Sequence, residues 1–239
     1  FLFSFISISC TSSSSSSSTT STDNTTTTGL FVTVGWEGTI LTSSDGISWT
    51  SRTSGISKLL NGVTYGNNTF VTVGNSGTIL TSSDGNSWNE RTSGISKSLR
   101  EVTYGNGLFV TVGLSGTILT SLDGTSWTER TSGISKLLNE VTYGNSIFVT
   151  VGQSGTVLTS SDGTTWTSRT SGTTEDLYGG VTYGNSIFVT VDSSGTILTS
   201  SDGTTWTVRI TGTWRNLKEV TYGNGLFVTV GNLGIIYTS

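Results

Sequence analysis

The sequence predicts an all-β fold assembled from repeated units, and three observations lead to this prediction. Glycine is abundant at 32 residues, proline is absent, and only 11% of the residues are charged, a mixture poor in helix formers. Short strand-like segments alternate with Gly, Asn or Asp turns along most of the chain. The third observation is the nearly constant spacing of a Phe-Val-Thr-Val segment, whose phenylalanines are Phe31, Phe70, Phe109, Phe148, Phe188 and Phe227.

Each repeat unit holds four strand-like segments, which we name A to D in chain order. Examples are A at 63–66, B at 31–35, C at 38–43 and D at 49–53. Four antiparallel strands at a period near forty residues are typical of the blades of a β-propeller. A β-solenoid would use shorter units, and helical repeats would show a 3.6-residue period. We therefore expect a propeller of about six four-stranded antiparallel blades over residues 30–239.

The number of strands leaves the closure of this propeller open. Segments B and C occur six times and A and D five times, which gives 22 expected strands. Either the Thr-rich stretch before Gly29 supplies a further A strand, or the sequence is cut at its C-terminus. Every earlier unit continues into an Asp-Gly turn beyond the point equivalent to Ser239, which favours the second alternative and a larger parent propeller.

The first 29 residues differ from the repeats. Residues 1–10 are an apolar run ending at Cys10, and they resemble the remnant of a bacterial lipoprotein signal whose cysteine becomes lipidated. Residues 11–29 are almost entirely Ser and Thr and are expected to form a flexible linker. The alternative is a disordered end with an incidental cysteine.

Composition excludes several classes of function. A net charge of −4 and no cluster of Lys or Arg argue against nucleic acid as a partner. The absence of His removes the usual general base and metal ligand, so we expect no metal site and no cofactor. The single Cys10 cannot form an internal disulfide, and a lipid anchor is the only membrane contact that we expect.

A turn motif between segments C and D carries an Asp-Gly pair followed by a Trp. We expect the Asp to accept backbone hydrogen bonds, the Gly to take a positive φ in a two-residue hairpin, and the Trp to pack on the neighbouring blade. These structural residues are Asp45, Asp84, Asp123, Asp162 and Asp202 with Trp49, Trp88, Trp127, Trp166 and Trp206. An Arg three residues after each Trp is likewise expected to pair or pack locally.

This turn motif resembles the Asp-box of the BNR repeats, in a form with one residue fewer between Asp and Gly. The resemblance covers nearly all of residues 30–239 and extends to the Ycf48-type photosystem assembly factors and to sialidase-like propellers. It implies the propeller architecture, and it leaves the activity open because one fold hosts many functions.

Comparison of the units divides their loops into two sets. The A–B and C–D turns hardly change, whereas the B–C tips and the D–A connections vary, and both variable sets should emerge on one face of the propeller. We call this surface the variable face. Its candidate binding residues are Trp36, Arg100, Leu114, Gln153, Tyr178, Trp214 and Arg215. Exposed aromatics with arginine are typical of recognition surfaces, and drift in unconstrained loops is the alternative.

The functional expectation is an exported, membrane-tethered or secreted bacterial monomer that binds a protein or a glycan through the variable face. One alternative is a sialidase-like glycoside hydrolase, which requires paired carboxylates. The acidic residues that break the repeat are Glu37, Glu175, Asp176 and Asp192. Because these are few and the central strands look nearly identical, we do not expect an enzyme. A Ycf48-like assembly factor is the other alternative.

Overall fold

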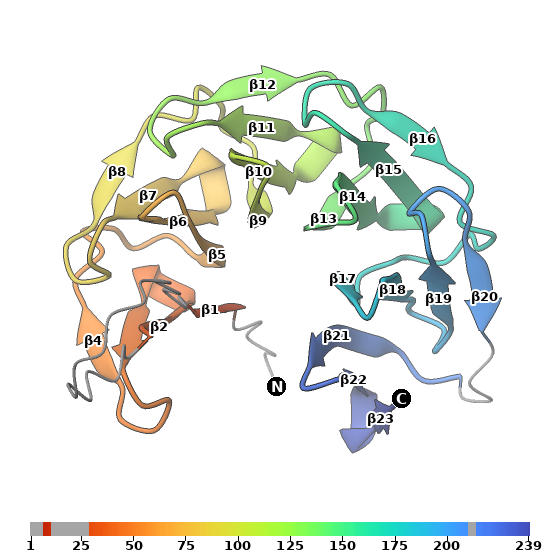
Figure 1. Cartoon of the computed structure of the whole chain (residues 1–239). Helices are drawn as coiled ribbons and strands as arrows, with labels where there is room; N and C mark the ends of the chain where they lie inside the picture. The colour runs from red at the N-terminus through yellow and green to blue at the C-terminus, as the bar shows by residue number, and fades with distance from the viewer. Residues whose placement is uncertain (1–6, 11–28, 210–213) are drawn as a thin grey trace, which may run out of the picture.

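The computed structural model describes residues 7–10, 29–209 and 214–239 of the chain. Its 23 strands form six antiparallel sheets, five with four strands and one with three. Figure 1 shows the sheets following one another in an arc around a central axis, each with its first strand innermost. The expected all-β propeller of six blades is confirmed.

The blades are numbered 1 to 6 in chain order, and each runs from an inner strand to an outer one. The inner strands are β1 (Ser7–Cys10), β5 (Leu60–Gly66), β9 (Leu99–Gly105), β13 (Leu138–Gly144), β17 (Val181–Gly184) and β21 (Leu217–Gly223). The second strands are β2 (Phe31–Val34), β6 (Thr69–Gly74), β10 (Leu108–Gly113), β14 (Ile147–Gly152), β18 (Ile187–Val191) and β22 (Leu226–Gly231). The third strands are β3 (Ile40–Ser43), β7 (Ile79–Ser82), β11 (Ile118–Ser121), β15 (Thr156–Ser160), β19 (Ile197–Ser200) and β23 (Ile236–Thr238). The outer strands are β4 (Thr50–Arg52), β8 (Asn89–Arg91), β12 (Thr128–Arg130), β16 (Thr167–Arg169) and β20 (Thr207–Arg209).

The strand beyond the expected 22 is the inner strand of blade 1. It comes from Ser7–Cys10, which pairs antiparallel with β2, and so from the segment expected to be a signal remnant. In the five other blades a threonine of the second strand donates its hydroxyl to a carbonyl in the inner strand or directly before it, as Thr72 does to Gly62 at 2.8 Å. The corresponding Thr33 Oγ1 of blade 1 is buried without a partner. The expected linker at 11–28 lies outside the described residues.

The two-residue hairpin of blades 2 to 6 is not at the expected place. It lies between the first and second strands, where Asn67 (φ 45°) and Asn68 (φ 57°) are both left-handed, as a type I′ turn requires. The Asp-Gly motif instead forms a longer connection at 44–49 between β3 and β4. Its Gly46 does adopt a positive φ of 72°.

The Asp-Gly connection is held by its own hydrogen bonds, as expected. Asp45 Oδ1 accepts the backbone N–H of Ile47 at 2.8 Å and that of Ser48 at 2.7 Å. Ser43 Oγ donates to the same carboxylate at 2.8 Å. The corresponding backbone and serine bonds recur at the other four aspartates. These contacts account for the aspartates as structural residues.

The arginine that follows each tryptophan bonds locally too. Its Nε donates to a threonine hydroxyl on the neighbouring third strand, as Arg52 does to Thr42 at 2.8 Å. The other four pairs are Arg91 with Thr81, Arg130 with Thr120, Arg169 with Thr159 and Arg209 with Thr199. These arginines therefore tie the outer strand to the sheet.

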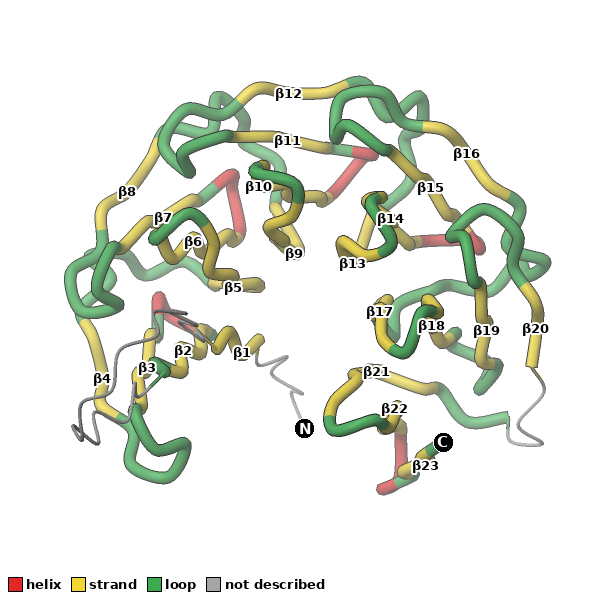
Figure 2. Tube along the Cα trace, in the orientation of Figure 1, coloured by secondary structure: helices red, strands yellow, loops and turns green. Residues whose placement is uncertain are grey.

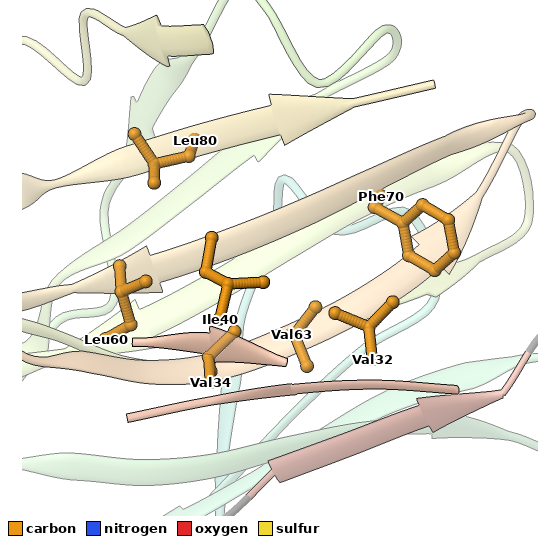
Figure 3. Packing of buried hydrophobic residues seen from close by; sticks show 7 residues of the cluster. All are labelled: Val32, Val34, Ile40, Leu60, Val63, Phe70 and Leu80. Carbon is orange, nitrogen blue, oxygen red and sulfur yellow. The ribbon is translucent and has the colours of Figure 1, made fainter. Parts of the chain in front are cut away.

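The hydrophobic core lies between consecutive blades. Figure 3 shows one such cluster, to which blade 1 contributes Val32, Val34 and Ile40, and blade 2 contributes Leu60, Val63, Phe70 and Leu80. Similar clusters join each later pair of blades. Trp88, Trp127 and Trp166 pack at the edges of these clusters, as expected for the turn motif.

In blades 3 to 6 a tyrosine of the inner strand fills a space beside a glycine of the preceding blade. The ring of Tyr143 in blade 4 occupies the position that a Cβ on Gly105 of blade 3 would take. The same contact occurs for Gly66 with Tyr104, Gly144 with Tyr183 and Gly184 with Tyr222. Close packing of neighbouring blades near the axis therefore requires glycine at this point of the repeat.

We predict that Gly105→Ala destabilises the protein by about 2 kcal/mol, because the added methyl overlaps the ring of Tyr143 and overpacking a core costs roughly 1–3 kcal/mol. The matched control is Gly223→Ala at the same repeat position, where a Cβ meets no atom of the described residues within 4 Å. Urea unfolding of the two variants measures the difference. Equal stabilities would contradict the role of this contact.

Candidate functional site

The two variable sets of loops lie on the same face, as expected from the strand order. The N–H of Asn75, at the tip between the second and third strands of blade 2, donates to the carbonyl of Leu59 in the connection from blade 1. Equivalent bonds join Leu114 to Ser98, Gln153 to Leu137, Ser193 to Asp176 and Asn232 to Asn216. Most tips form a single 3-10 turn, drawn red in Figure 2. The tips and the connections therefore lie side by side on the variable face from blade to blade.

Three of the candidate binding residues on this face are strongly exposed. Trp214 is 92% exposed, Trp36 48% and Leu114 42%, and Gln153 and Arg215 are also exposed. Trp36 belongs to blade 1, whereas Trp214 lies in the connection to blade 6, so the aromatic residues are spread along the arc. Their binding role stays a prediction.

Two candidate binding residues, Tyr178 and Arg100, lie close enough for the charge of the arginine to act on the phenol. Tyr178 and Asp176 lie in the connection to blade 5, which is one residue longer than the others, and Arg100 lies in β9. Burial, the charge of Asp176 and a hydrogen bond from the phenol to that carboxylate raise the pKa of Tyr178, and Arg100 opposes this effect. The side chain of Asn139 donates to the carbonyl of Tyr178 at 2.9 Å and so fixes the loop to blade 4.

A group of glutamates at the inner strands was missed by the sequence analysis. The residue before the first Val-Thr-Tyr valine of the innermost segment is Gly62, Glu101, Glu140, Gly180 and Glu219 in blades 2 to 6, so the central segments are not as faithful as expected. The carboxylate of Glu101 lies beside Gly62 of the preceding blade, and that of Glu219 lies beside Gly180. Blade-by-blade comparison of this one position would have found the group.

These glutamates have strongly shifted proton affinities. Burial raises the pKa of Glu101 to about 8, and the charge of Glu219 adds to this effect. Burial also raises the pKa of Glu219 to about 7. The pKa of Glu140 lies well above its usual range because of burial and because Glu101 and Glu219 are near. Arg100 partly offsets the shift of Glu140, which places this arginine close to the same group.

Asp192 is a buried carboxylate that departs from the repeat at the tip of blade 5. It replaces a glycine of the other blades and has no solvent exposure. Its Oδ1 accepts the backbone N–H groups of Ser194 at 2.9 Å and Thr196 at 2.8 Å. The side chain therefore stabilises the tip in place of a 3-10 turn.

The described part of the chain holds neither a metal-type cluster nor a membrane-type helix. No group of three or more His, Cys, Asp or Glu residues within it is arranged to hold a metal ion. No helix in the same residues is both long and apolar enough to cross a bilayer.

We predict that the melting temperature falls as the pH rises from about 5 to about 8. A carboxyl whose pKa is raised on folding binds its proton more tightly in the folded state than in the unfolded state. Its stabilising effect is therefore complete below the pKa of 4.5 in the unfolded state, and it is lost as the pH rises through the pKa in the folded state. Glu140→Gln should flatten this dependence and raise the melting temperature at pH 8.

The matched control for this prediction is Glu90→Gln, which removes an exposed carboxylate from the outer strand β8. It should leave the slope between pH 5 and pH 8 unchanged. Below about pH 4 the opposite trend should appear, because turn hydrogen bonds lower the pKa of Asp45 and Asp84 to about 2 and their contribution is lost on protonation. A pH-independent melting temperature between 5 and 8 would contradict the assignment of the inner-strand glutamates.

Comparisons with known proteins identify the fold. No protein-family model matches the sequence, and no curated protein matches it. A solved structure of YCF48 bound to D1 peptide is 20% identical with a TM-score of 0.70, over 88% of this chain and 74% of that chain. YCF48 from Cyanidioschyzon merolae is 16% identical with a TM-score of 0.66, over 87% and 78%. The computationally designed Ika8 protein is 16% identical with a TM-score of 0.69, over 87% and 67%. At these identities the similarity shows the β-propeller fold alone.

Proposed function

We propose that this chain is a binding module that recognises a protein partner through the variable face. The proposal rests on the exposure of Trp36, Leu114 and Trp214 at tips and connections. The blades share no apolar residue at these positions, so the three side chains are not required by the repeat. Large exposed aromatics anchor protein interfaces when a partner covers them. Arg100 and Tyr178 add polar groups nearer the axis.

The choice of a protein partner over a glycan draws on the structural comparison. One of the similar propellers is YCF48 in complex with a D1 peptide, so this architecture binds a polypeptide in at least one case. The present chain resembles that propeller in fold at 20% sequence identity, so its own partner has to be identified by experiment. A glycan ligand is the competing outcome of the binding test below.

Glycoside hydrolysis is a second candidate because carboxylates with raised pKa values do gather near the axis. Glu101 and Glu140 lie on neighbouring inner strands, and Arg100 is close to Glu140. A protonated and an ionised carboxyl side by side is the arrangement that acid catalysis of glycoside cleavage needs. Hydrolysis of an aryl glycoside or sialoside that is abolished by Glu140→Gln would establish this function instead.

The membrane tether is a separate part of the proposal. Lipidation at Cys10 follows cleavage before that residue, which would remove Ser7, Ile8 and Ser9 and with them most of β1. The tethered form would therefore expose the edge of β2. The buried, unpartnered hydroxyl of Thr33 supports this view, since β1 satisfies β2 less completely than the other inner strands satisfy their neighbours.

We predict that a peptide array and a glycan array will report a peptide ligand for the full chain. Joint replacement of Trp36, Tyr178 and Trp214 by alanine should weaken binding at least tenfold, since each aromatic anchor commonly contributes more than 1 kcal/mol. The control replaces Ile47 and Leu122 by alanine, two exposed apolar residues of the C–D connections at the opposite face. Equal losses in both variants would contradict the variable face as the site.

We also predict that expression of the signal-bearing precursor in a bacterial host with labelled palmitate gives a labelled, membrane-associated product. Cys10→Ser should abolish both the label and the membrane association, because the thiol is the only one in the chain. Cys10→Ser that fractionates like the parent would refute the tether and leave the binding proposal untouched.

A further inference from the structure

The hairpin between β5 and β6 contains an acceptor sequence for N-linked glycosylation (Figure 1). Asn67, Asn68 and Thr69 form an Asn-x-Thr sequence, and residues 30–239 contain no other Asn-x-Ser or Asn-x-Thr. Asn67 and Asn68 are the exposed two-residue turn, and Thr69 begins β6. The Thr69 hydroxyl donates to the carbonyl of Asn67 at 3.3 Å. The acceptor sequence therefore lies at the surface, where a bulky glycan has room.

Thr69 departs from the repeat at a position that otherwise packs on the neighbouring blade. The equivalent residue is aliphatic in the five other blades, as Leu30, Leu108, Ile147, Ile187 and Leu226. In blades 1, 3 and 4 this side chain lies against the glycine of the next Asp-Gly connection, as Leu108 does against Gly163. The corresponding glycine beside blade 2, Gly124, meets Val71 instead. The threonine that completes the acceptor sequence thus gives up a contact that other blades make.

A second departure from the repeat lies beside this hairpin. Leu122 of blade 3 occupies a position where the four other Asp-Gly connections have a serine, and it is 72% exposed. The Nδ2 atom of Asn67 lies 3.4 Å from the carbonyl oxygen of Leu122. The nitrogen that would carry a glycan and an exposed apolar side chain are therefore neighbours. Sugar rings have apolar faces of C–H groups, and such a face gains by covering an aliphatic side chain.

We propose that Asn67 is a site of N-linked glycosylation and that its glycan covers Leu122. The modifying enzyme is an oligosaccharyltransferase, which acts on chains as they cross a membrane, so the site rests on the proposed export of this chain. Nδ2 of Asn67 forms a bond to the anomeric carbon of an oligosaccharide linked to polyprenyl diphosphate. The bond from that carbon to the diphosphate oxygen breaks, polyprenyl diphosphate leaves, and the amide gives up one proton. The glycan lies opposite the variable face and leaves that face open.

The site is tested by secreting the full chain from yeast behind a cleavable secretion signal, so that the outcome does not depend on the native export route. After endoglycosidase H, mass spectrometry of the tryptic peptide 59–91 should find a single N-acetylglucosamine on Asn67. This peptide excludes the Asn-x-Thr sequence at 24–26, which is thereby kept apart. Asn67 without the sugar in the secreted, folded chain would overturn the proposal, whatever the variable face binds.

The matched variants are taken from the repeat itself. Thr69→Leu restores the residue type of the other blades, leaves Asn67 in place and should abolish the modification. Asn68→Gly gives the Asn-Gly turn of blades 3 and 6, keeps the acceptor sequence and should keep the glycan. Loss of the sugar in Asn68→Gly, or its retention in Thr69→Leu, would contradict the assignment to this acceptor sequence.

The contact with Leu122 has a separate readout. The glycosylated chain should melt about 2 °C above the same chain treated with peptide N-glycosidase, which leaves aspartate at position 67. This difference should disappear in Leu122→Ser, which has the residue of the other connections, because both chains then undergo the same change at position 67 and only the cover of the leucine is lost. An equal difference in both chains would reject the cover of Leu122.

Discussion

The fold depends on the apolar interface between consecutive blades, and on the tyrosine that packs against glycine within it. A single four-stranded sheet of this chain has two apolar faces and cannot bury either one alone. Each face is covered by the next unit, so the interface residues recur with little variation. The glycine allows the inner strands to approach closely near the axis, and any side chain there would push neighbouring blades apart.

This constraint explains where variation is tolerated. The Asp-Gly connections and their arginines hold the outer strands through bonds made within the blade, so all five blades that have an outer strand keep them. The tips and connections of the variable face make mostly backbone contacts, as between Asn75 and Leu59, and these accept many side chains. Aromatic residues can therefore accumulate on one face without disturbing the core.

The same crowding near the axis shapes the electrostatics of the molecule. A glutamate beside a glycine of the preceding blade has room for its carboxylate, as Glu101 has beside Gly62. Glu140 follows a blade that already carries Glu101, so two half-buried carboxyls lie on neighbouring strands. Their raised pKa values follow from this arrangement, and they couple the stability of the propeller to pH near neutrality.

The sequence by itself determined the repeat, the all-β propeller, the order of strands in each blade and the structural role of the Asp-Gly-Trp motif. These features follow from local turn chemistry and from a sequence period that recurs in every unit. Only the tertiary structure decided that Ser7–Cys10 serves as an inner strand and that Glu101, Glu140 and Glu219 gather near the axis. Each of these depends on which residues of different blades are brought together, and a pattern read within one unit does not contain contacts made across units.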